Sequence, residues 1–421
     1  MTTTTVPILI VGGGIGGLAT ALSLARSGFA VHLIERAEEF AEIGAGLQFG
    51  PNASRALDAL GLLEDILPLA VKPERAVMMD AVRGTPLTTL RLGEHFRRRY
   101  DYPYLVLHRS DLLDLLLAHC QEHELITLEN RRNVVDADVR PTGATVRCAD
   151  GSEYRTRALI AADGLHSTLR GKVVEDTAVC SGYAAYRGTV PMEQVSHTVA
   201  PDDVVLWVGP GIHLIQYPVR GATLYNQVAV FRSRRYRAGH TAEGQWGGPD
   251  ELTAAFAAAC GPVRDGVARI GRDRFWAMFD RAPVDSWING SLVLTGDAAH
   301  PMLQYLGQGA CQALEDAVEL GYRFRRHGSD IDSAYREFEW ARLPRTTRCQ
   351  TSARPWGELW HTDDAITVAV RDRYFAQRGE DDYSEVDWLY AAAEPGTAAP
   401  GLTHSADATT SPDPATAGST A

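Results

Sequence analysis

The apolar and polar positions at the start of the chain predict a strand, a tight turn and a helix. A run of apolar, mostly β-branched residues at 8–11 stops at a cluster of glycines, and an alanine- and leucine-rich stretch follows as far as Arg26. A second apolar run, residues 30–34, ends in Glu35. We therefore expect a βαβ unit, followed by a loop and a helix, within residues 1–75.

The middle of the chain predicts more strands. After a helix at residues 110–125, the segment 127–164 predicts two or three strands with an Asp-Gly turn, and the last of these returns to the first sheet. Residues 181–280 alternate in a way that predicts an antiparallel sheet with one face in water. We expect this sheet to form one wall of a substrate pocket.

The last part of the chain predicts a return to the first sheet. The apolar run at 291–295 predicts one more strand, and residues 308–325 predict a helix. Beyond them, residues 394–421 are rich in Thr, Ala, Ser and Pro and poor in large apolar side chains, which predicts a disordered tail.

The glycine cluster has the spacing of a dinucleotide-binding turn. Gly12 permits the tight turn, Gly14 allows the backbone to approach a pyrophosphate, and Gly17 allows the helix to pack against the strand. Glu35 follows at the distance expected for an acid that accepts a hydrogen bond from a ribose 2′-hydroxyl. The pattern therefore predicts an unphosphorylated adenosine ribose, as in FAD or NAD, with Ile15 and Arg36 beside it.

Composition excludes several other classes of protein. At 421 residues the chain predicts two associated lobes, and a net charge of −12 disfavours nucleic acid as a partner. The uncharged segment 7–25 is interrupted by glycines and lacks a basic leader, so we expect neither a signal sequence nor a membrane span. Six cysteines without a CxxC pair suit reduced thiols in the cytoplasm. His119, Glu122 and His123 have a metalloprotease spacing, but no further ligand cluster accompanies them, and we expect no metal.

Four ordered motifs together resemble the single-component flavoprotein aromatic hydroxylases. They are GGGIGG with Glu35 and Arg36, HRSDL at 108–112, ALIAADGLHSTLR at 158–170, and GDAAHP at 296–301. The resemblance extends to about residue 393. It implies bound FAD with these further contacts: Arg109 near the flavin chain, Asp163 and Gly164 supporting cofactor and reductant, Gly296, Asp297 and Pro301 at the ribityl and pyrophosphate region, and Gly307 and Gly309 at a helix N-terminus facing the flavin.

The same resemblance implies an α/β fold with a Rossmann-like FAD-binding domain of the glutathione-reductase type and an inserted β-rich substrate domain. The predicted division is residues 1–75, 106–180 and 286–393 for the FAD-binding domain with its C-terminal helices, 76–105 and 181–285 for the substrate domain, and 394–421 for the tail. No second glycine fingerprint with its own strand and acid occurs in the sequence. We therefore expect NADH or NADPH to dock transiently on the FAD domain.

Several segments are similar to the gentisate-forming branch of this family, whose members hydroxylate 3-hydroxybenzoate with O2 through a flavin C4a-hydroperoxide. The segments include 181–189, 213–221, 300–310 and 356–361. The likeness implies that His213 and Gln304 flank the phenol, and that Tyr217 and Tyr104 orient the ring and carboxylate. His213 and Tyr217 share one face of a predicted strand, and imidazole suits proton transfer at neutral pH.

Other interpretations stay open at the level of the sequence. His213 could be a satisfied core histidine, Gln304 a turn residue that caps backbone groups, and Tyr104 a core aromatic side chain. The substrate could instead be salicylate, anthranilate or another aryl acid. A FAD oxidase or reductase, or a flavin-binding protein without catalysis, is the alternative from a different class. A homodimer is expected from the family.

Overall fold

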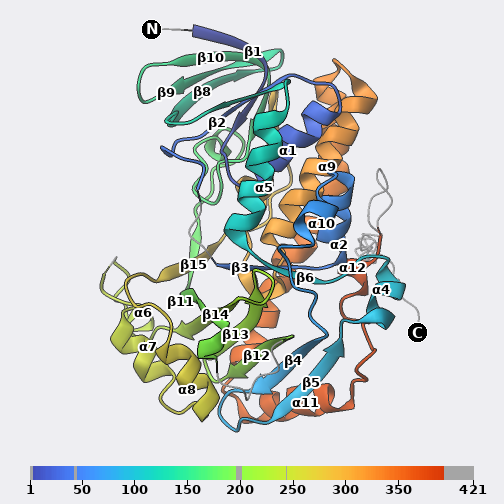
Figure 1. Cartoon of the computed structure of the whole chain (residues 1–421). Coiled ribbons are helices and arrows are strands. Elements are labelled where there is room, and N and C mark those ends of the chain that lie inside the picture. The colour runs from blue at the N-terminus through green and yellow to red at the C-terminus, as the bar shows by residue number, and fades with distance from the viewer. Residues whose placement is uncertain (1–2, 42–44, 196–201, 243, 393–421) are drawn as a thin grey trace, which may run out of the picture.

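The chain folds into two large sheets linked by helices and a two-stranded sheet, and its class is mixed α/β, as predicted. The structure is a computed structural model that describes residues 3–41, 45–195, 202–242 and 244–392. Figure 1 places the first sheet and the second sheet at opposite ends of the molecule, with long helices beside and below the first. The predicted tail, residues 394–421, lies outside the described residues.

The first sheet has a parallel centre in the order β17, β10, β1, β2, β7. These strands are β1 (Thr3–Val11), β2 (Val31–Ile34), β7 (Ile126–Glu129), β10 (Glu153–Ala161) and β17 (Leu292–Leu294). The antiparallel additions are β8 (Val134–Arg140), β9 (Gly143–Cys148) and β16 (Ile288–Asn289). The predicted return of residues 291–295 to this sheet is confirmed.

The register of the first sheet collects the predicted cofactor motifs at one edge. Val11 pairs with both Ile34 and Ala161, and Ala161 pairs with Leu294. The carboxyl ends of four parallel strands therefore meet at one level, where ligands of open α/β sheets bind. The glycine turn, Glu35, Asp163 and Gly296 follow directly after those ends.

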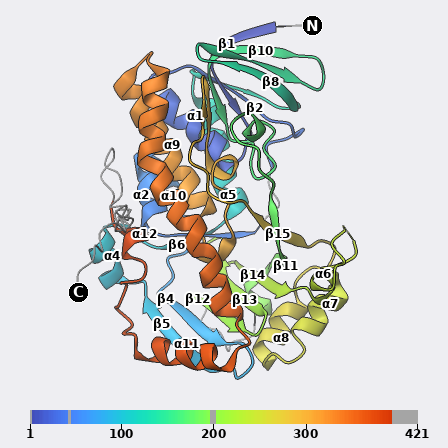
Figure 2. The same cartoon turned by 180° about the vertical axis from the view of Figure 1, so that it is seen from behind.

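Helices cover the first sheet and connect it with the second. They are α1 (Ile15–Arg26), α2 (Pro51–Ala59), α3 (Leu63–Ile66), α5 (Arg109–Glu122), α9 (Gly309–His327) and α10 (Ile331–His361). The helix α1 packs against α5 and α9, and α9 packs against α10. The helix α10 spans the back of the molecule (Figure 2): Phe338 lies in the core of the first sheet, and Ala353 packs in a cluster under the second.

The second sheet has the order β15, β11, β14, β13, β12, β4, β5. Its strands are β4 (Arg75–Asp80), β5 (Pro86–Arg91), β11 (Val179–Pro191), β12 (Asp203–Gly209), β13 (Ile212–Val219), β14 (Leu224–Arg232) and β15 (Trp276–Asp280). The expectation that residues 181–280 form antiparallel pairs is confirmed, and the parallel pair in this sheet joins β12 to β4 from outside that range. The expectation of one face in water was wrong, because β12, β13 and β14 are buried on both faces.

The reason is that both faces of the second sheet have a cover. The helices α7 (Pro249–Ala255) and α8 (Gly261–Ala268) bury one face, where Leu214 and Phe231 pack against Leu252 and Val263. The other face meets α10 and a cavity. Polar positions on these strands are satisfied inside the protein: the side chain of Gln216 accepts a hydrogen bond from Trp207 Nε1 at 3.0 Å and donates one to Gln227 at 2.7 Å.

The remaining elements lie around and between the two sheets (Figure 1). They are β3 (Gly46–Phe49), β6 (Leu105–His108), α4 (Glu94–Tyr100), α6 (Arg234–Arg237), α11 (Ala365–Gln377), α12 (Asp387–Tyr390), and the 3-10 helices η1 (Arg170–Lys172), η2 (Met192–Gln194), η3 (Gly296–Ala298) and η4 (Gln304–Leu306). The strand β6 joins the two cores: Leu105 and Leu107 pack in that of the first sheet, and Val106 packs beside Tyr217 of the second.

Candidate active site

A cavity of about 540 Å³ lies between the two sheets, and residues from both line it. Its cofactor end comprises the glycine turn at residues 14–16 together with 295–297 and 307–310. Its aromatic end comprises Gln48, Tyr104, Arg187, His213, Tyr217, Gln304 and Trp360. One continuous space therefore joins most of the predicted cofactor residues to the predicted substrate residues.

The glycine turn is as tight as its spacing predicts. Gly12 has φ +110°, and a Cβ there would lie 2.3 Å from the carbonyl oxygen of Ala162. A Cβ on Gly17 would lie 1.9 Å from the carbonyl oxygen of Gly12. Gly14 is the N-cap of α1 and Ile15 its first residue, and both line the cavity. The amides at the start of α1 are thus available to an anion, as a pyrophosphate requires.

Glu35 holds the glycine turn from the end of β2. Its Oε2 accepts a hydrogen bond from the Gly13 amide at 2.6 Å, and its Oε1 accepts one from the Ala37 amide at 2.8 Å. A carboxylate oxygen has a second lone pair, so these bonds leave acceptor capacity for a ribose hydroxyl. Arg36 is exposed beside it.

The opposite wall of the cofactor end carries Asp297 and Arg109. Asp297 lies in η3 with its side chain exposed at the cavity. Arg109 is the first residue of α5; burial lowers the pKa of its guanidinium, while the charge of Asp297 acts in the opposite direction. Gly307 has φ +63° and Gly309 begins α9, so a second helix N-terminus opens on the same cavity. This pairing of two helix starts suits a cofactor with a pyrophosphate and an electron-accepting ring.

Asp163 and Pro301 support this region from behind. Asp163 accepts hydrogen bonds from Ser167 Oγ at 2.6 Å and from the Thr168 amide at 2.9 Å, which fixes the turn that places Gly164 at the cavity. The carbonyl oxygen of Pro301 accepts a hydrogen bond from Gln350 Nε2 at 3.1 Å.

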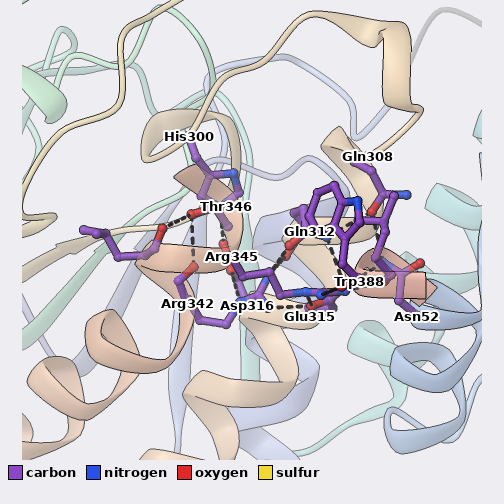
Figure 3. A network of polar contacts seen from close by, with 12 residues as sticks. Asn52, His300, Gln308, Gln312, Glu315, Asp316, Arg342, Arg345, Thr346 and Trp388 are labelled. Atoms are coloured by element: carbon purple, nitrogen blue, oxygen red, sulfur yellow. Dashed lines mark hydrogen bonds and ion pairs between the residues drawn. The ribbon is translucent and has the colours of Figure 1, made fainter. Parts of the chain in front are cut away.

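A buried polar network holds the loop after β17 (Figure 3). Asp316 of α9 accepts hydrogen bonds from the Gly296 amide at 3.0 Å and from Thr295 Oγ1 at 3.1 Å. His300 Nε2 lies 2.6 Å from the same carboxylate, and Arg342 Nε donates to it at 2.8 Å. Burial alone raises the pKa of Asp316, but His300 and Arg342 outweigh it and hold that pKa far below its usual range. His300 is thus structural, as expected.

The second half of the network fixes the start of α9. Gln308 Oε1 accepts hydrogen bonds from Asn52 Nδ2 at 3.0 Å and from Gln312 Nε2 at 2.9 Å. Asn52 also donates to Glu315 at 2.6 Å. Burial alone raises the pKa of Glu315, but Arg345 and Arg342 lower it to about 2. The position of the 307–309 backbone therefore depends on charges that lie outside the cavity.

The aromatic end begins with β13. His213, Ile215 and Tyr217 line the cavity, whereas Leu214 and Gln216 face α8, which confirms the predicted division of this strand. Burial lowers the pKa of His213 to about 3, so its imidazole is neutral at pH 7. Gln304 is the first residue of η4 and is exposed at the cavity.

Sequence reasoning missed Gln48, which connects the two predicted tyrosines. Tyr104 donates its hydroxyl hydrogen to Gln48 Oε1 at 2.9 Å, and the Gln48 side chain also hydrogen-bonds to Tyr217. Burial raises the pKa of both phenols, so both are neutral. No motif points to Gln48, because its place depends on the pairing of β3 with β6.

Arg187 of β11 was also missed, although the sequence carries a signal for it. It is a lone cation in the apolar segment 184–190. Its guanidinium lies 4.1 Å from the centre of the Trp276 ring, and its buried Nε has no hydrogen-bond partner among the described residues. Burial, then Arg109 and Arg274, lower its pKa to about 10. Arg187 therefore remains a cation at pH 7 that an anionic ligand can pair with.

The fold and this cavity define a flavoprotein in which FAD fits the cofactor end. A family model described as FAD binding domain matches residues 5–328. The chain is 37% identical over 384 residues to 3-hydroxybenzoate 6-hydroxylase of Polaromonas naphthalenivorans (strain CJ2), covering 91% of this chain and 95% of that protein. It is 37% identical over 387 residues to 3-hydroxybenzoate 6-hydroxylase of Klebsiella oxytoca, covering 92% and 96%. The chain therefore belongs to the FAD-dependent aromatic hydroxylases.

A solved structure supports the same placement. Klebsiella pneumoniae HpxO, complexed with FAD and uric acid, superposes with a TM-score of 0.77 at 25% identity, covering 90% of this chain and 94% of that one. Among the described residues, the helices are each too short or too polar to cross a bilayer. The same residues contain no cluster of three His, Cys, Asp or Glu side chains suited to a metal; His119 instead lies 3.0 Å from Asp65.

Proposed function

We propose that the protein hydroxylates 3-hydroxybenzoate to gentisate, para to the existing hydroxyl, with NADH and O2. The observation that carries the proposal is the continuity of one cavity from the FAD cradle to an aromatic chamber that holds a neutral histidine and a buried cation. The names of the two relatives, which match nearly the whole chain, point to the same substrate.

The residues of the aromatic end suit a phenol that carries a carboxylate. His213 presents an imidazole nitrogen that can accept the phenolic proton, which makes the ring more nucleophilic at its ortho and para carbons. We assign to Gln304, which lines the same cavity, a hydrogen bond from its amide to the phenol. Arg187 pairs with the substrate carboxylate, and the hydrogen-bonded set of Tyr104, Gln48 and Tyr217 orients the ring.

When bound, FAD accepts electrons from the nicotinamide and activates O2. The residues that would hold it are Asp297 and the two helix starts at Gly14 and Gly309, with Glu35 at the end of β2. The protein also excludes water, because apolar side chains such as Ile215, Val228 and Leu206 line the space between the two ends.

The test is oxygen consumption and product analysis with the purified yellow protein, NADH, and 2-, 3- and 4-hydroxybenzoate in parallel. We expect gentisate from 3-hydroxybenzoate with little hydrogen peroxide. A hydroxylated product from salicylate or anthranilate alone would move the substrate to another aryl acid. NADH oxidation that yields only peroxide with every ring would indicate an oxidase or reductase, and no NADH oxidation would indicate a binding protein.

We further propose a cytoplasmic homodimer. The family resemblance supports the dimer, and six free cysteines are compatible with a reducing compartment. Light scattering of the FAD-loaded protein tests the dimer, and NADPH in place of NADH in the oxygen assay tests the reductant.

A further inference from the structure

The histidine at the aromatic end does not stand alone. His213 Nδ1 lies 2.7 Å from Nε2 of His361, the last residue of α10, and the two imidazole planes are 16° apart with their centroids 5.0 Å from each other. Tyr183 stacks on the far side of His361 at 4.6 Å, and the edge of Tyr305 meets both imidazoles. Both histidines are almost fully buried. The sequence places them 148 positions apart, and no motif connects them.

The contact fixes the chemistry of each nitrogen. Two neutral imidazoles in this geometry share one hydrogen between His213 Nδ1 and His361 Nε2. If His213 donates it, the free His213 nitrogen is Nε2, which carries the lone pair a phenol proton needs. In the same state His361 carries its hydrogen on Nδ1, a buried atom with no partner among the described residues.

The chain that follows His361 reaches the surface. The next residues are Thr362 and Asp363, and the Asp363 carboxylate, whose side chain is 66% exposed, accepts a hydrogen bond from Arg232 Nη2 at 2.9 Å. Burial, then His213 and Arg232, lower the pKa of His361 well below its usual value. A proton that reaches His361 therefore does not stay there.

We propose that His213 and His361 form a two-histidine relay that carries the phenolic proton of the substrate from the cavity to the surface at the end of α10. The phenol O–H bond breaks as His213 Nε2–H forms. The His213 Nδ1–H bond breaks as His361 Nε2–H forms, and the His361 Nδ1 proton passes to water beside Asp363. Each imidazole ends neutral, which avoids a buried imidazolium. His361 does not line the cavity and acts on the substrate only through His213. The proposal rests on the proposed function.

The experiment compares His361→Gln and His361→Phe with the wild-type, all FAD-loaded. Glutamine can accept the His213 Nδ1 hydrogen and so keep that tautomer, but it cannot pass a proton on; phenylalanine does neither. Each protein, complexed with 3-hydroxybenzoate and without NADH, is mixed rapidly with alkaline buffer, and the ultraviolet absorbance of the phenolate is followed. His119→Gln, a surface change of the same kind, is the matched control.

We expect the phenol of both variants to ionise at least about tenfold more slowly than that of the wild type, while FAD and substrate affinity stay nearly unchanged. The control should match the wild type. A wild-type rate in His361→Gln with a slow rate in His361→Phe would reduce His361 to an orienting group and overturn the relay. Wild-type rates in both variants would overturn any role.

Two further measurements cover the remaining outcomes. If neither variant folds with FAD, the solvent isotope dependence of the wild-type ionisation decides: a curved dependence on deuterium content supports several protons in motion, and a linear one refutes the relay. If the wild-type protein neither binds nor hydroxylates 3-hydroxybenzoate, the proposed function fails. In that case the shared proton is sought by nuclear magnetic resonance of the substrate-free holoenzyme with labelled histidines, and its absence overturns the pair.

Discussion

The cofactor end of the cavity is shaped by backbone, whereas the aromatic end is shaped by side chains that come together from β3, β11, β13 and α10. At the cofactor end, neighbouring residues in the sequence are neighbours in the site: Gly12, Gly14 and Gly17 act within one turn. At the aromatic end, Arg187, His213 and His361 meet only because the strands pair and α10 ends against them. The first kind of site can be recognised in the sequence as a motif, whereas the second kind is formed only by the complete fold.

The two ends also differ in charge. The cofactor end has helix N-termini and is held by the carboxylates of Glu315 and Asp316, which remain ionised through their arginine and histidine partners. At the aromatic end, His213, Tyr104 and Tyr217 are neutral, whereas Arg187 is a cation. The Arg187 cation among neutral side chains favours a ligand that carries a negative charge.

The largest effect is expected from Gly17→Ala, which breaks the cofactor end. The added methyl carbon would lie 1.9 Å from the Gly12 carbonyl oxygen, so the turn must move. We expect loss of bound FAD and a free energy of unfolding lower by about 3 kcal/mol. Flavin absorbance per chain and urea unfolding measure both. Gly271→Ala is the control, because a Cβ there meets nothing within 4 Å. A yellow, stable Gly17→Ala protein would refute the tight turn.

The second largest effect is expected from a substitution that changes only the aromatic end. His213→Asn removes the base and should lower the rate of hydroxylation about 100-fold. The cofactor end is intact, so the variant should retain FAD and still oxidise NADH, with hydrogen peroxide in place of the hydroxylated product. The ratio of product to NADH consumed is the readout. An unchanged ratio would show that His213 is a core histidine and no base.

The contrast between these two variants explains what the sequence could predict. The first sheet, its parallel order and the glycine turn follow from local patterns, and the return of residues 291–295 follows from an apolar run. Gln48 and His361 carry no such local signal for their roles, because their positions depend on strand pairing and on where α10 ends. Arg187 carries one, as a lone cation in an apolar segment, but that signal does not show which groups surround it. The prediction that one face of the second sheet lies in water was wrong for the same reason, because alternation within a strand does not reveal that α7 and α8 cover that face.

A smaller effect tests the selectivity of the aromatic end. Arg187→Gln should raise the KM for 3-hydroxybenzoate roughly tenfold to hundredfold with little change in kcat, because a charge-assisted hydrogen bond to the carboxylate is lost. The uncharged 3-hydroxybenzamide is the matched ligand, and its affinity should hardly change. An equal loss for both ligands would mean that Arg187 supports the packing around Trp276 and does not bind the carboxylate.

The two ends also differ in how stability depends on pH. The pKa of His213 is about 3 in the folded protein and 6.5 ordinarily, so below pH 6.5 the unfolded chain binds a proton that the folded chain does not. Stability should therefore fall with pH from 6.5 downward, by about 1.4 kcal/mol per pH unit for each such histidine. The pKa of Glu315 is about 2 in the folded protein against 4.5 ordinarily, so its contribution is complete above pH 4.5 and is lost between 4.5 and 2.

Urea unfolding across this range separates the two contributions, although they overlap between pH 4.5 and 3. His213→Phe should reduce the slope between pH 6.5 and 3 and leave in place the additional fall that Glu315 causes below 4.5. Glu315→Gln should flatten only the lower range, at the cost of a less stable protein at neutral pH, because Arg342 and Arg345 lose a charged partner. If the plot of unfolding free energy against pH for each variant instead stays parallel to that of the wild type, the two ends do not differ in charge as described. If His213→Phe also removed the additional fall below pH 4.5, the histidine pair, and not the carboxylate network, would govern the acid stability of both ends.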